Sequence, residues 1–192
     1  MILRECFGYT PCIIEKKNLP LQMIGCISAI QASLLALGLH NLCRIIRQEQ
    51  MTFKYQEYID ELMAQGLSMP VLYAPKGMKA YRFVFSGDNT NNHKPVCVQK
   101  PSRQLPDNEK FSGYALSCFN SQQKAEQRYS SLCKSFKRVP KVIGDSLCGG
   151  FIQNEDGMVT SPNVCSGHFD LYESETCDLS KTFNIIEVLW KN

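Results

Sequence analysis

The pattern of apolar and polar residues changes sharply near residue 50. Residues 1–50 hold just over half of the leucines and isoleucines of the chain, whereas most of the aromatic residues follow Met51. The stretch 19–43 contains no Asp, Glu, Lys or Arg. It could therefore form a packed helix or a weak membrane anchor. Alternatively, residues 1–50 could come from an overlong start, with Met51 as the true first residue. We expect an apolar N-terminal segment, 1–50, followed by a single globular domain, 51–192.

Helical and strand periodicities follow each other from Met51 onward. Apolar residues at helical spacing predict a helix over about 53–65, which Gly66 would end. Residues 81–85 alternate with a period of two and predict a strand. After a polar turn, residues 95–98 predict a short strand that pairs back as a hairpin.

A strand and a helix are predicted in the middle of the domain. Residues 114–119 indicate a strand, and Asn120 or Ser121 then caps a helix. The expected inner face of this helix consists of Ala125, Tyr129, Leu132, Cys133 and Phe136. Pro140 would force the chain out of the helix.

The C-terminal part is predicted to consist mostly of strands. Residues 149–153 and 158–160 flank an Asn-Glu-Asp-Gly turn, which is typical of a hairpin. Residues 167–175 predict another strand, 178–180 a helical turn, and 183–190 a strand, although the spacing of the last segment also fits a helix. Together, these elements predict an α+β fold with a largely antiparallel sheet and two or three helices.

Composition narrows the class of protein without indicating a function. A net charge of +3 over 192 residues is too small to indicate nucleic-acid binding by itself. The ten cysteines have neither zinc-ligand spacing nor a Cys-x-x-Cys pair, so we expect reduced, mostly buried thiols and a cytoplasmic protein. The sequence contains no phosphate loop, dinucleotide fingerprint or metalloprotease motif, and we expect neither a cofactor nor a metal.

Four basic residues lie at and beyond the end of the predicted central helix. They are Lys134, Lys137, Arg138 and Lys141. Such residues complement the dipole at the C-terminal end of a helix, which is the simpler explanation. They could also form a phosphate-binding patch. Nucleic acid therefore stays open as a partner beside protein, and a membrane contact is expected only through residues 19–43.

Residues 167–175 gather a histidine, carboxylates and a tyrosine at regular spacing. On a strand, His168, Asp170 and Tyr172 would line one face, and Phe169 and Leu171 would enter the core from the other. A histidine can shuttle protons near neutral pH, and a neighbouring carboxylate can orient it. The three polar residues are therefore candidates for acid–base chemistry, or they form the solvent-exposed side of a strand.

Two further residues would complete such a site if their strand neighbours the His168 strand. Arg82 lies on the predicted strand 81–85, and His93 lies in the polar segment after it. Two imidazoles could serve as base and acid in metal-independent phosphodiester cleavage, with Arg82 stabilising the developing phosphate charge. The alternative is that both histidines are structural.

A second enzymatic hypothesis is ADP-ribosyl transfer. Arg82 on an early strand, the serine-containing segment 117–121 and a late acidic residue, Glu173 or Glu175, match the layout of such enzymes loosely. No distinct glutamate motif accompanies them.

Three segments carry a family resemblance. They are Gly-Tyr-Ala-Leu-Ser-Cys-Phe (113–119), Gly-His-Phe-Asp-Leu-Tyr-Glu (167–173) and Asp-Leu-Ser-Lys-Thr-Phe (178–183). Their sequences resemble those of short uncharacterised bacterial proteins, with similarity from about Met51 to the C-terminus. This resemblance implies a bacterial cytosolic setting and no particular activity. We therefore expect a small soluble binding or accessory factor, with a small enzyme of ribonuclease or ADP-ribosyltransferase-like type as the alternative.

Overall fold

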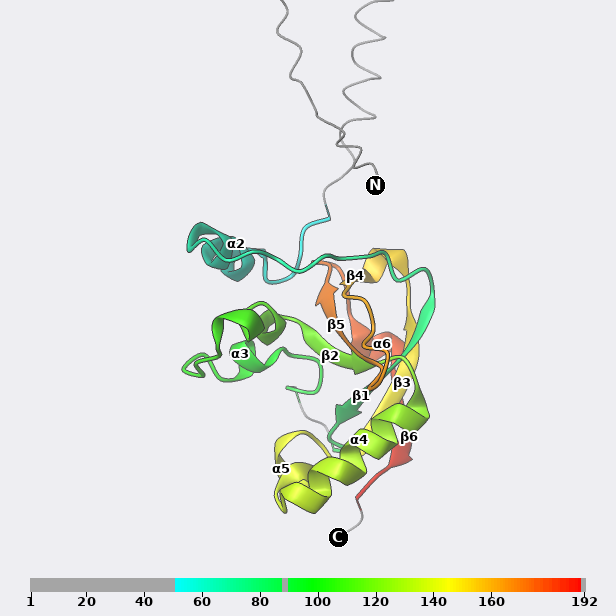
Figure 1. Cartoon of the computed structure of the whole chain (residues 1–192). Coiled ribbons are helices and arrows are strands. Elements are labelled where there is room, and N and C mark those ends of the chain that lie inside the picture. The colour runs from blue at the N-terminus through cyan, green and yellow to red at the C-terminus, as the bar shows by residue number, and fades with distance from the viewer. Residues whose placement is uncertain (1–50, 88–89, 191–192) are drawn as a thin grey trace, which may run out of the picture. The chain divides into compact units, whose positions relative to one another are not determined.

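A computed structural model describes residues 51–87 and 90–190, which belong to one compact α+β unit. Their strands form an antiparallel sheet in the order β4-β5-β2-β1-β3-β6 (Figure 1). The strands are β1 Met78–Val84, β2 Leu116–Phe119, β3 Ser146–Ile152, β4 Gly157–Val159, β5 His168–Glu173 and β6 Asn184–Val188. The predicted fold class is therefore confirmed. The predictions for residues 1–50, including an anchor at 19–43, lie outside the described residues.

Short helices connect these strands. They are α2 Gln56–Ala64, α3 Val96–Gln99, α4 Gln122–Ser135, α5 Val139–Val142 and α6 Leu179–Thr182, with 3-10 turns at Asp107–Glu109, Ser112–Tyr114 and Asn154–Asp156. The described residues thus hold more helical segments than the two or three expected. Of the two caps predicted for α4, Asn120 and Ser121, the structure has Ser121, whose side chain accepts a hydrogen bond from the amide of Lys124.

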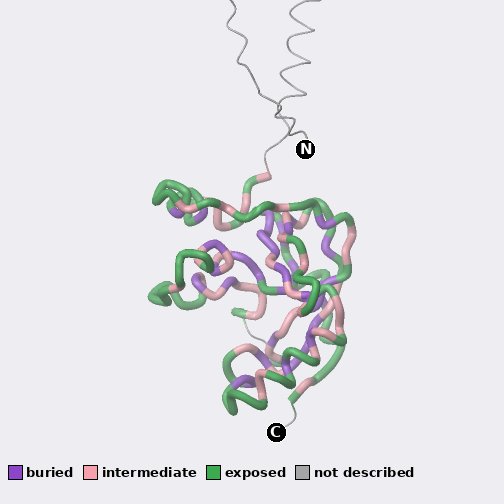
Figure 2. The backbone as a smooth tube through the Cα atoms, in the orientation of Figure 1, coloured by how far each residue is buried: buried purple, intermediate pink, exposed green. Residues whose placement is uncertain are grey.

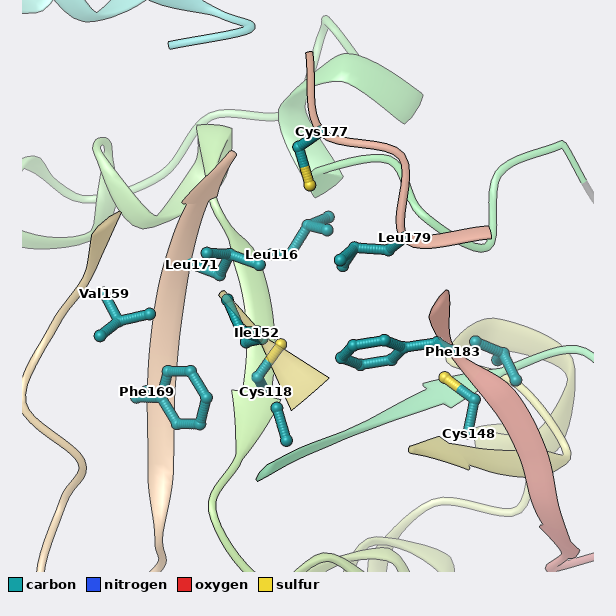
Figure 3. Packing of buried hydrophobic residues seen from close by; sticks show 12 residues of the cluster. Leu116, Cys118, Cys148, Ile152, Val159, Phe169, Leu171, Cys177, Leu179 and Phe183 are labelled. Carbon is teal, nitrogen blue, oxygen red and sulfur yellow. The ribbon is translucent and has the colours of Figure 1, made fainter. Parts of the chain in front are cut away.

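Alternating side chains divide the core between the two faces of the sheet. On one face, Leu179 of α6 is buried in one cluster with Cys118 of β2 and Phe169 of β5 (Figure 3). On the other face, α4 covers β1 and β2, and Ala125 packs with Phe119. Figure 2 shows the central strands largely buried and the loop after α3 exposed.

Two predicted strand pairings are wrong. Residues 149–153 and 158–160 lie on β3 and β4, but β3 pairs with β1 and β6, whereas β4 pairs with β5. The chain from Ile152, the end of β3, to Gly157, the start of β4, spans at most about 18 Å. These two strands are four positions apart in the sheet, which in a flat sheet is about 19 Å. The sheet must therefore curl to let β4 reach its far edge. Residues 95–98 were expected as a strand, but most of them form α3.

The central helix ends earlier than its sequence pattern predicts. α4 stops at Ser135, and Pro140 lies inside the next helical turn, α5, instead of ending α4. Ala125 and Tyr129 are buried as expected, whereas Phe136 is 63% exposed. The predicted inner face therefore holds for the first half of the helix and fails at its C-terminal end.

Strands β1 and β2 part soon after they meet. The described pairing between them consists of Tyr81 opposite Phe119. Beyond this pair, the Asn92 side chain takes the place of a neighbouring strand, because its amide nitrogen donates to Phe85 O and its oxygen accepts from Phe85 N. The segment that contains α3 lines the widening gap. This opening in the sheet positions the candidate site.

No helix among the described residues is long and apolar enough to cross a membrane. The cysteines of the described residues are all free, and most of them are buried. Burial raises the pKa of the Cys118 thiol to about 12, which keeps it protonated at neutral pH. Cys118 thus behaves as a small core residue.

Candidate functional site

The residues of the predicted acid–base strand do not share one exposed face. His168 and Asp170 are partly exposed on β5, but Tyr172 is 1% exposed. The prediction that Tyr172 lies on the exposed side is therefore wrong. α2 causes the difference, because Ile59 and Leu62 of this helix pack against the tyrosine in a second apolar cluster. The Tyr172 hydroxyl has no hydrogen-bond partner among the described residues.

His168 contacts a residue that sequence reasoning did not pair with it. Its Nε2 lies 2.6 Å from Ser117 Oγ, and Ser117 is opposite Asp170 in the β2–β5 register. Asp170 Oδ1 lies 3.9 Å from the same Nε2, while Oδ2 accepts a 2.7 Å hydrogen bond from Ser112 Oγ. In a serine–histidine–aspartate triad, the carboxylate instead holds the opposite ring nitrogen. The signal for Ser117 in the sequence was a single polar residue within an apolar strand.

Burial raises the pKa of the Asp170 carboxyl above its usual value, against the effects of the Ser112 hydrogen bond and the His168 charge. The group is therefore protonated more readily than an exposed aspartate. This places a carboxyl of raised pKa beside a partly exposed imidazole and a hydroxyl.

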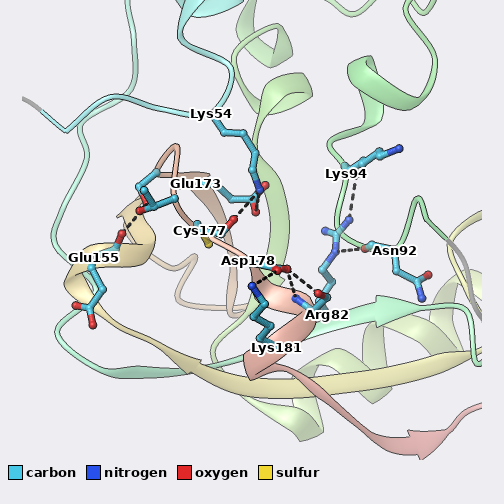
Figure 4. A network of polar contacts seen from close by, with 12 residues as sticks. Lys54, Arg82, Asn92, Lys94, Glu155, Glu173, Cys177, Asp178 and Lys181 are labelled. Atoms are coloured by element: carbon cyan, nitrogen blue, oxygen red, sulfur yellow. Dashed lines mark hydrogen bonds and ion pairs between the residues drawn. The ribbon is translucent and has the colours of Figure 1, made fainter.

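Arg82 lies in the opening between β1 and β2 and binds backbone carbonyl groups. Its Nε donates to Asn92 O at 2.9 Å, Nη1 to Ser117 O at 2.9 Å and Nη2 to Lys94 O at 3.4 Å (Figure 4). The guanidinium thus ties β2 to the segment before α3. Arg82 and His168 approach Ser117 from different directions, one at its carbonyl oxygen and the other at its hydroxyl.

His93 lies apart from His168. Its ring meets Phe183 edge-on, with the ring centroids 6.3 Å apart, so it lies against the side of the sheet that α6 covers. Burial, and next the positive charge of Arg82, lower the pKa of His93 to about 4. Its Nδ1 is buried with no hydrogen-bond partner among the described residues. The structure therefore brings Arg82 near His93, and Arg82 near Ser117, without uniting the two histidines.

A partly buried ion pair lies close to this region. Lys54 Nζ is 3.0 Å from Glu173 Oε1 and donates to Cys177 O at 2.8 Å (Figure 4). Burial raises the pKa of Glu173, although the Lys54 charge opposes this. Glu173 is therefore a structural anchor for the start of the described residues and lies on the opposite sheet face from the His168 imidazole.

The opening between β1 and β2 contains a cleft of about 200 Å³. Its lining residues are Arg82, Phe83, Phe85, Asn91, Asn92, Lys94, Pro95, Val96, Gln99, Lys100, Arg103, Ala115, Ser117, Val142 and Ile143. None of the lining residues that the structure describes is acidic. Aromatic and aliphatic side chains supply much of the surface, and Lys94, Lys100 and Arg103 add positive charge.

These three cations are not neutralised within residues 51–87 and 90–190. No carboxylate of that part of the chain lies within ion-pair distance of Lys94, Lys100 or Arg103. Hydrogen bonds also fix the segment that carries Lys94, since Gln99 Nε2 donates to Lys94 O at 2.7 Å and to Asn91 O at 3.1 Å. The cleft is thus electropositive and its wall is held in place before a ligand arrives.

The basic residues predicted as a phosphate patch lie beside this cleft in the chain. Lys134, Lys137, Arg138 and Lys141 precede Val142 and Ile143, which line it. Sequence reasoning singled out this run and Arg82, but missed Lys94, Lys100 and Arg103. Their signal was weak, because they flank the predicted short strand 95–98 among prolines and polar residues and belong to no motif.

Comparisons with known proteins give no match: no family model, no curated protein and no solved structure is similar to the chain. The function is therefore inferred from the geometry of the described residues.

Proposed function

We propose that the protein is a small binding protein whose cleft between β1 and β2 takes a nucleotide unit, that is, a planar base joined through a sugar to a phosphate. The observation that carries this proposal is the set of three cations, Lys94, Lys100 and Arg103, which lie around a partly aromatic cleft without a carboxylate partner among the described residues. Unneutralised cations favour an anion, and an aromatic surface favours a planar base.

The two halves of such a ligand suit different parts of the lining. Phe83, Phe85 and Val142 offer apolar surface to a base. Lys100 and Arg103 are exposed and can reach a phosphate at the rim. Arginine binds phosphate through two parallel hydrogen bonds, whereas lysine acts as a point charge.

Calorimetric titration of the full chain with thymidine monophosphate and with thymidine tests this proposal. The monophosphate is expected to bind more tightly than the nucleoside, because the rim cations meet its phosphate. Replacement of both Lys100→Glu and Arg103→Glu is expected to weaken monophosphate binding at least about ten-fold. Lys76→Glu, an exposed charge reversal before β1, is the matched control and is expected to leave binding unchanged. The proposal would be refuted if nucleoside and monophosphate bind equally tightly, or if the double variant binds the monophosphate as tightly as the wild type.

A second candidate function is cleavage of a bound phosphodiester. The 2.6 Å contact between Ser117 Oγ and His168 Nε2 favours it, since Ser117 also lines the cleft. Ser117 Oγ would attack phosphorus while His168 takes its proton, and the leaving oxygen would take that proton from His168 as its bond to phosphorus breaks. Water would then hydrolyse the resulting phosphodiester of Ser117, with His168 taking the proton of the water and returning it to Ser117 Oγ as the bond from Oγ to phosphorus breaks, and Asp170 would stabilise the imidazolium.

Incubation of the full chain with an end-labelled oligonucleotide tests this second function. Cleavage by the wild type that disappears in both His168→Ala and Ser117→Ala would support it, provided the two variants still bind thymidine monophosphate. An oligonucleotide left intact by the wild type would reduce the proposal to binding alone.

A further inference from the structure

We infer that the ligand is a single-stranded nucleic acid, and that Phe136 stacks on a base outside the cleft. This inference rests on the proposed function and extends it from one nucleotide unit to a strand. It starts from the one part of α4 where the helical pattern fails.

Phe136 is an exposed aromatic side chain on a fixed backbone. Phe136 is 63% exposed, although helical spacing predicted it on the inner face of the helix. Its N–H donates to Leu132 O at 2.8 Å, and its own carbonyl accepts from Val139 N at 3.3 Å. The ring therefore projects from an ordered junction between α4 and α5, and it needs little ordering when it meets a ligand.

Basic residues flank Phe136 in the chain, and the helix dipole does not account for all of them. Lys134 lies in the last turn of α4, where a cation is favourable. Lys137 and Arg138 follow the end of that helix, and Arg138 directly precedes α5, where a positive charge gains nothing from the helix dipole. Neither has a carboxylate within ion-pair distance in the described part of the chain. This arrangement favours an external polyanion as their partner.

The junction is continuous with the cleft. Lys137 and Arg138 link Phe136 to the single helical turn α5, and Val142 at the end of that turn lines the cleft. Four residues of α helix advance by about 6 Å. A strand with one nucleotide in the cleft would thus pass its neighbouring phosphates over Arg138 and Lys141 and bring a following base to Phe136.

A single strand fits these features better than a duplex. Stacking on one exposed ring needs an unpaired base whose face is free, and a duplex keeps its base faces inside the helix. Aromatic stacking together with cations that follow the backbone is the usual way in which proteins bind single strands without reading sequence. The expected ligand is therefore a single strand with little sequence preference.

Fluorescence anisotropy with labelled oligothymidylates of increasing length, measured on the full chain, tests the inference. Affinity is expected to rise clearly from thymidine monophosphate to oligomers of several nucleotides. Phe136→Ala is expected to weaken oligomer binding by roughly 5- to 150-fold, as for the loss of one stacked base, while binding of the monophosphate changes less than about two-fold. Phe136→Trp is expected to keep oligomer binding. Val164→Ala removes another exposed apolar side chain and serves as the control.

The outcomes separate this inference from the proposed function. Monophosphate binding that depends on Lys100 and Arg103, combined with no gain in affinity for longer strands, would overturn the inference and leave the cleft proposal standing. An oligomer that binds the wild type and Phe136→Ala equally would overturn it as well, as would equal competition by a duplex of the same length. A wild type that binds neither the monophosphate nor the oligomers would refute both the inference and the proposed function.

Discussion

Replacement of Arg82 tests the structural basis of the cleft. Its guanidinium makes two hydrogen bonds of 2.9 Å and one of 3.4 Å to backbone carbonyls on β2 and on the segment before α3. Hydrogen bonds that involve a charged group each contribute about 1.5–3 kcal/mol. The long bond is weak and Arg82 is partly exposed, so we take the lower limit for the two short bonds. Arg82→Met is therefore expected to lower the free energy of unfolding by about 3 kcal/mol.

Arg82→Lys separates charge from geometry. An ammonium group keeps the charge but replaces the planar fork, so it can satisfy one or two of the three carbonyls. The expected loss is about half of that in Arg82→Met. Arg128→Lys, on the exposed side of α4, provides a matched control and is expected to change stability by less than about 0.5 kcal/mol.

Urea denaturation of the full chain, followed by circular dichroism, measures these differences. A second readout is the titration of His93 by NMR. Since the Arg82 charge contributes to the low pKa of His93, this pKa is expected to rise in Arg82→Met and to stay low in Arg82→Lys. Stability of Arg82→Met within about 0.5 kcal/mol of the wild type would refute the reasoning, because Arg82 would then not hold the two strands together.

Three further predictions concern the surroundings of the site. The folded pKa of His93, about 4, lies below its unfolded value of 6.5, so its contribution to stability is full above pH 6.5 and is lost as the pH falls toward 4. After allowance for solvent screening, this loss is about 1–2 kcal/mol. In urea denaturation, the free energy of unfolding of His93→Gln should therefore fall less between pH 7 and pH 4.5 than that of the wild type, by about this amount. A Cβ on Gly113 would collide with Cys97 Sγ of α3, so Gly113→Ala is expected to lower the free energy of unfolding by about 1–3 kcal/mol. A Cβ on Gly87 meets open space, so Gly87→Ala should leave stability unchanged in the same assay. Tyr172→Phe removes a buried hydroxyl without a partner among the described residues and should raise the midpoint of thermal unfolding, by an amount equivalent to about 1 kcal/mol; a clear loss would reveal a contact of that hydroxyl.

The contrast between the basic run and the His168 strand shows how structure changed the candidate site. The run at 134–141 was explained most simply by a helix dipole, but α4 ends at Ser135 and leaves Lys137 and Arg138 without that explanation. His168 had been the first candidate, yet its partner is Ser117, not His93. The cleft is the stronger candidate because its cations, Lys94, Lys100 and Arg103, gather from both sides of a segment, 95–98, that the sequence pattern predicted only as a short strand.

Local patterns in the sequence determined much of the secondary structure. The period of two in residues 81–85 and 168–172 reflects strands with one face in a core, and β1 and β5 lie there. Ser121 caps α4 because its side chain can accept the hydrogen bond of a free amide in the first turn. Such signals involve residues within a few positions of each other, so the sequence carries them directly.

Tertiary structure alone decided which strands pair and what covers each face. β3 and β4 are neighbours in the sequence, yet they pair with different strands, because the free energy of pairing depends on cores that distant segments complete. The alternation on β5 placed Tyr172 on one face, but it could not reveal that α2, more than a hundred residues earlier, buries that face. The cleft likewise exists because β1 and β2 part and Arg82 binds the carbonyls left between them. Periodicity records which way a side chain points, whereas burial and charge depend on what the folded chain brings against it.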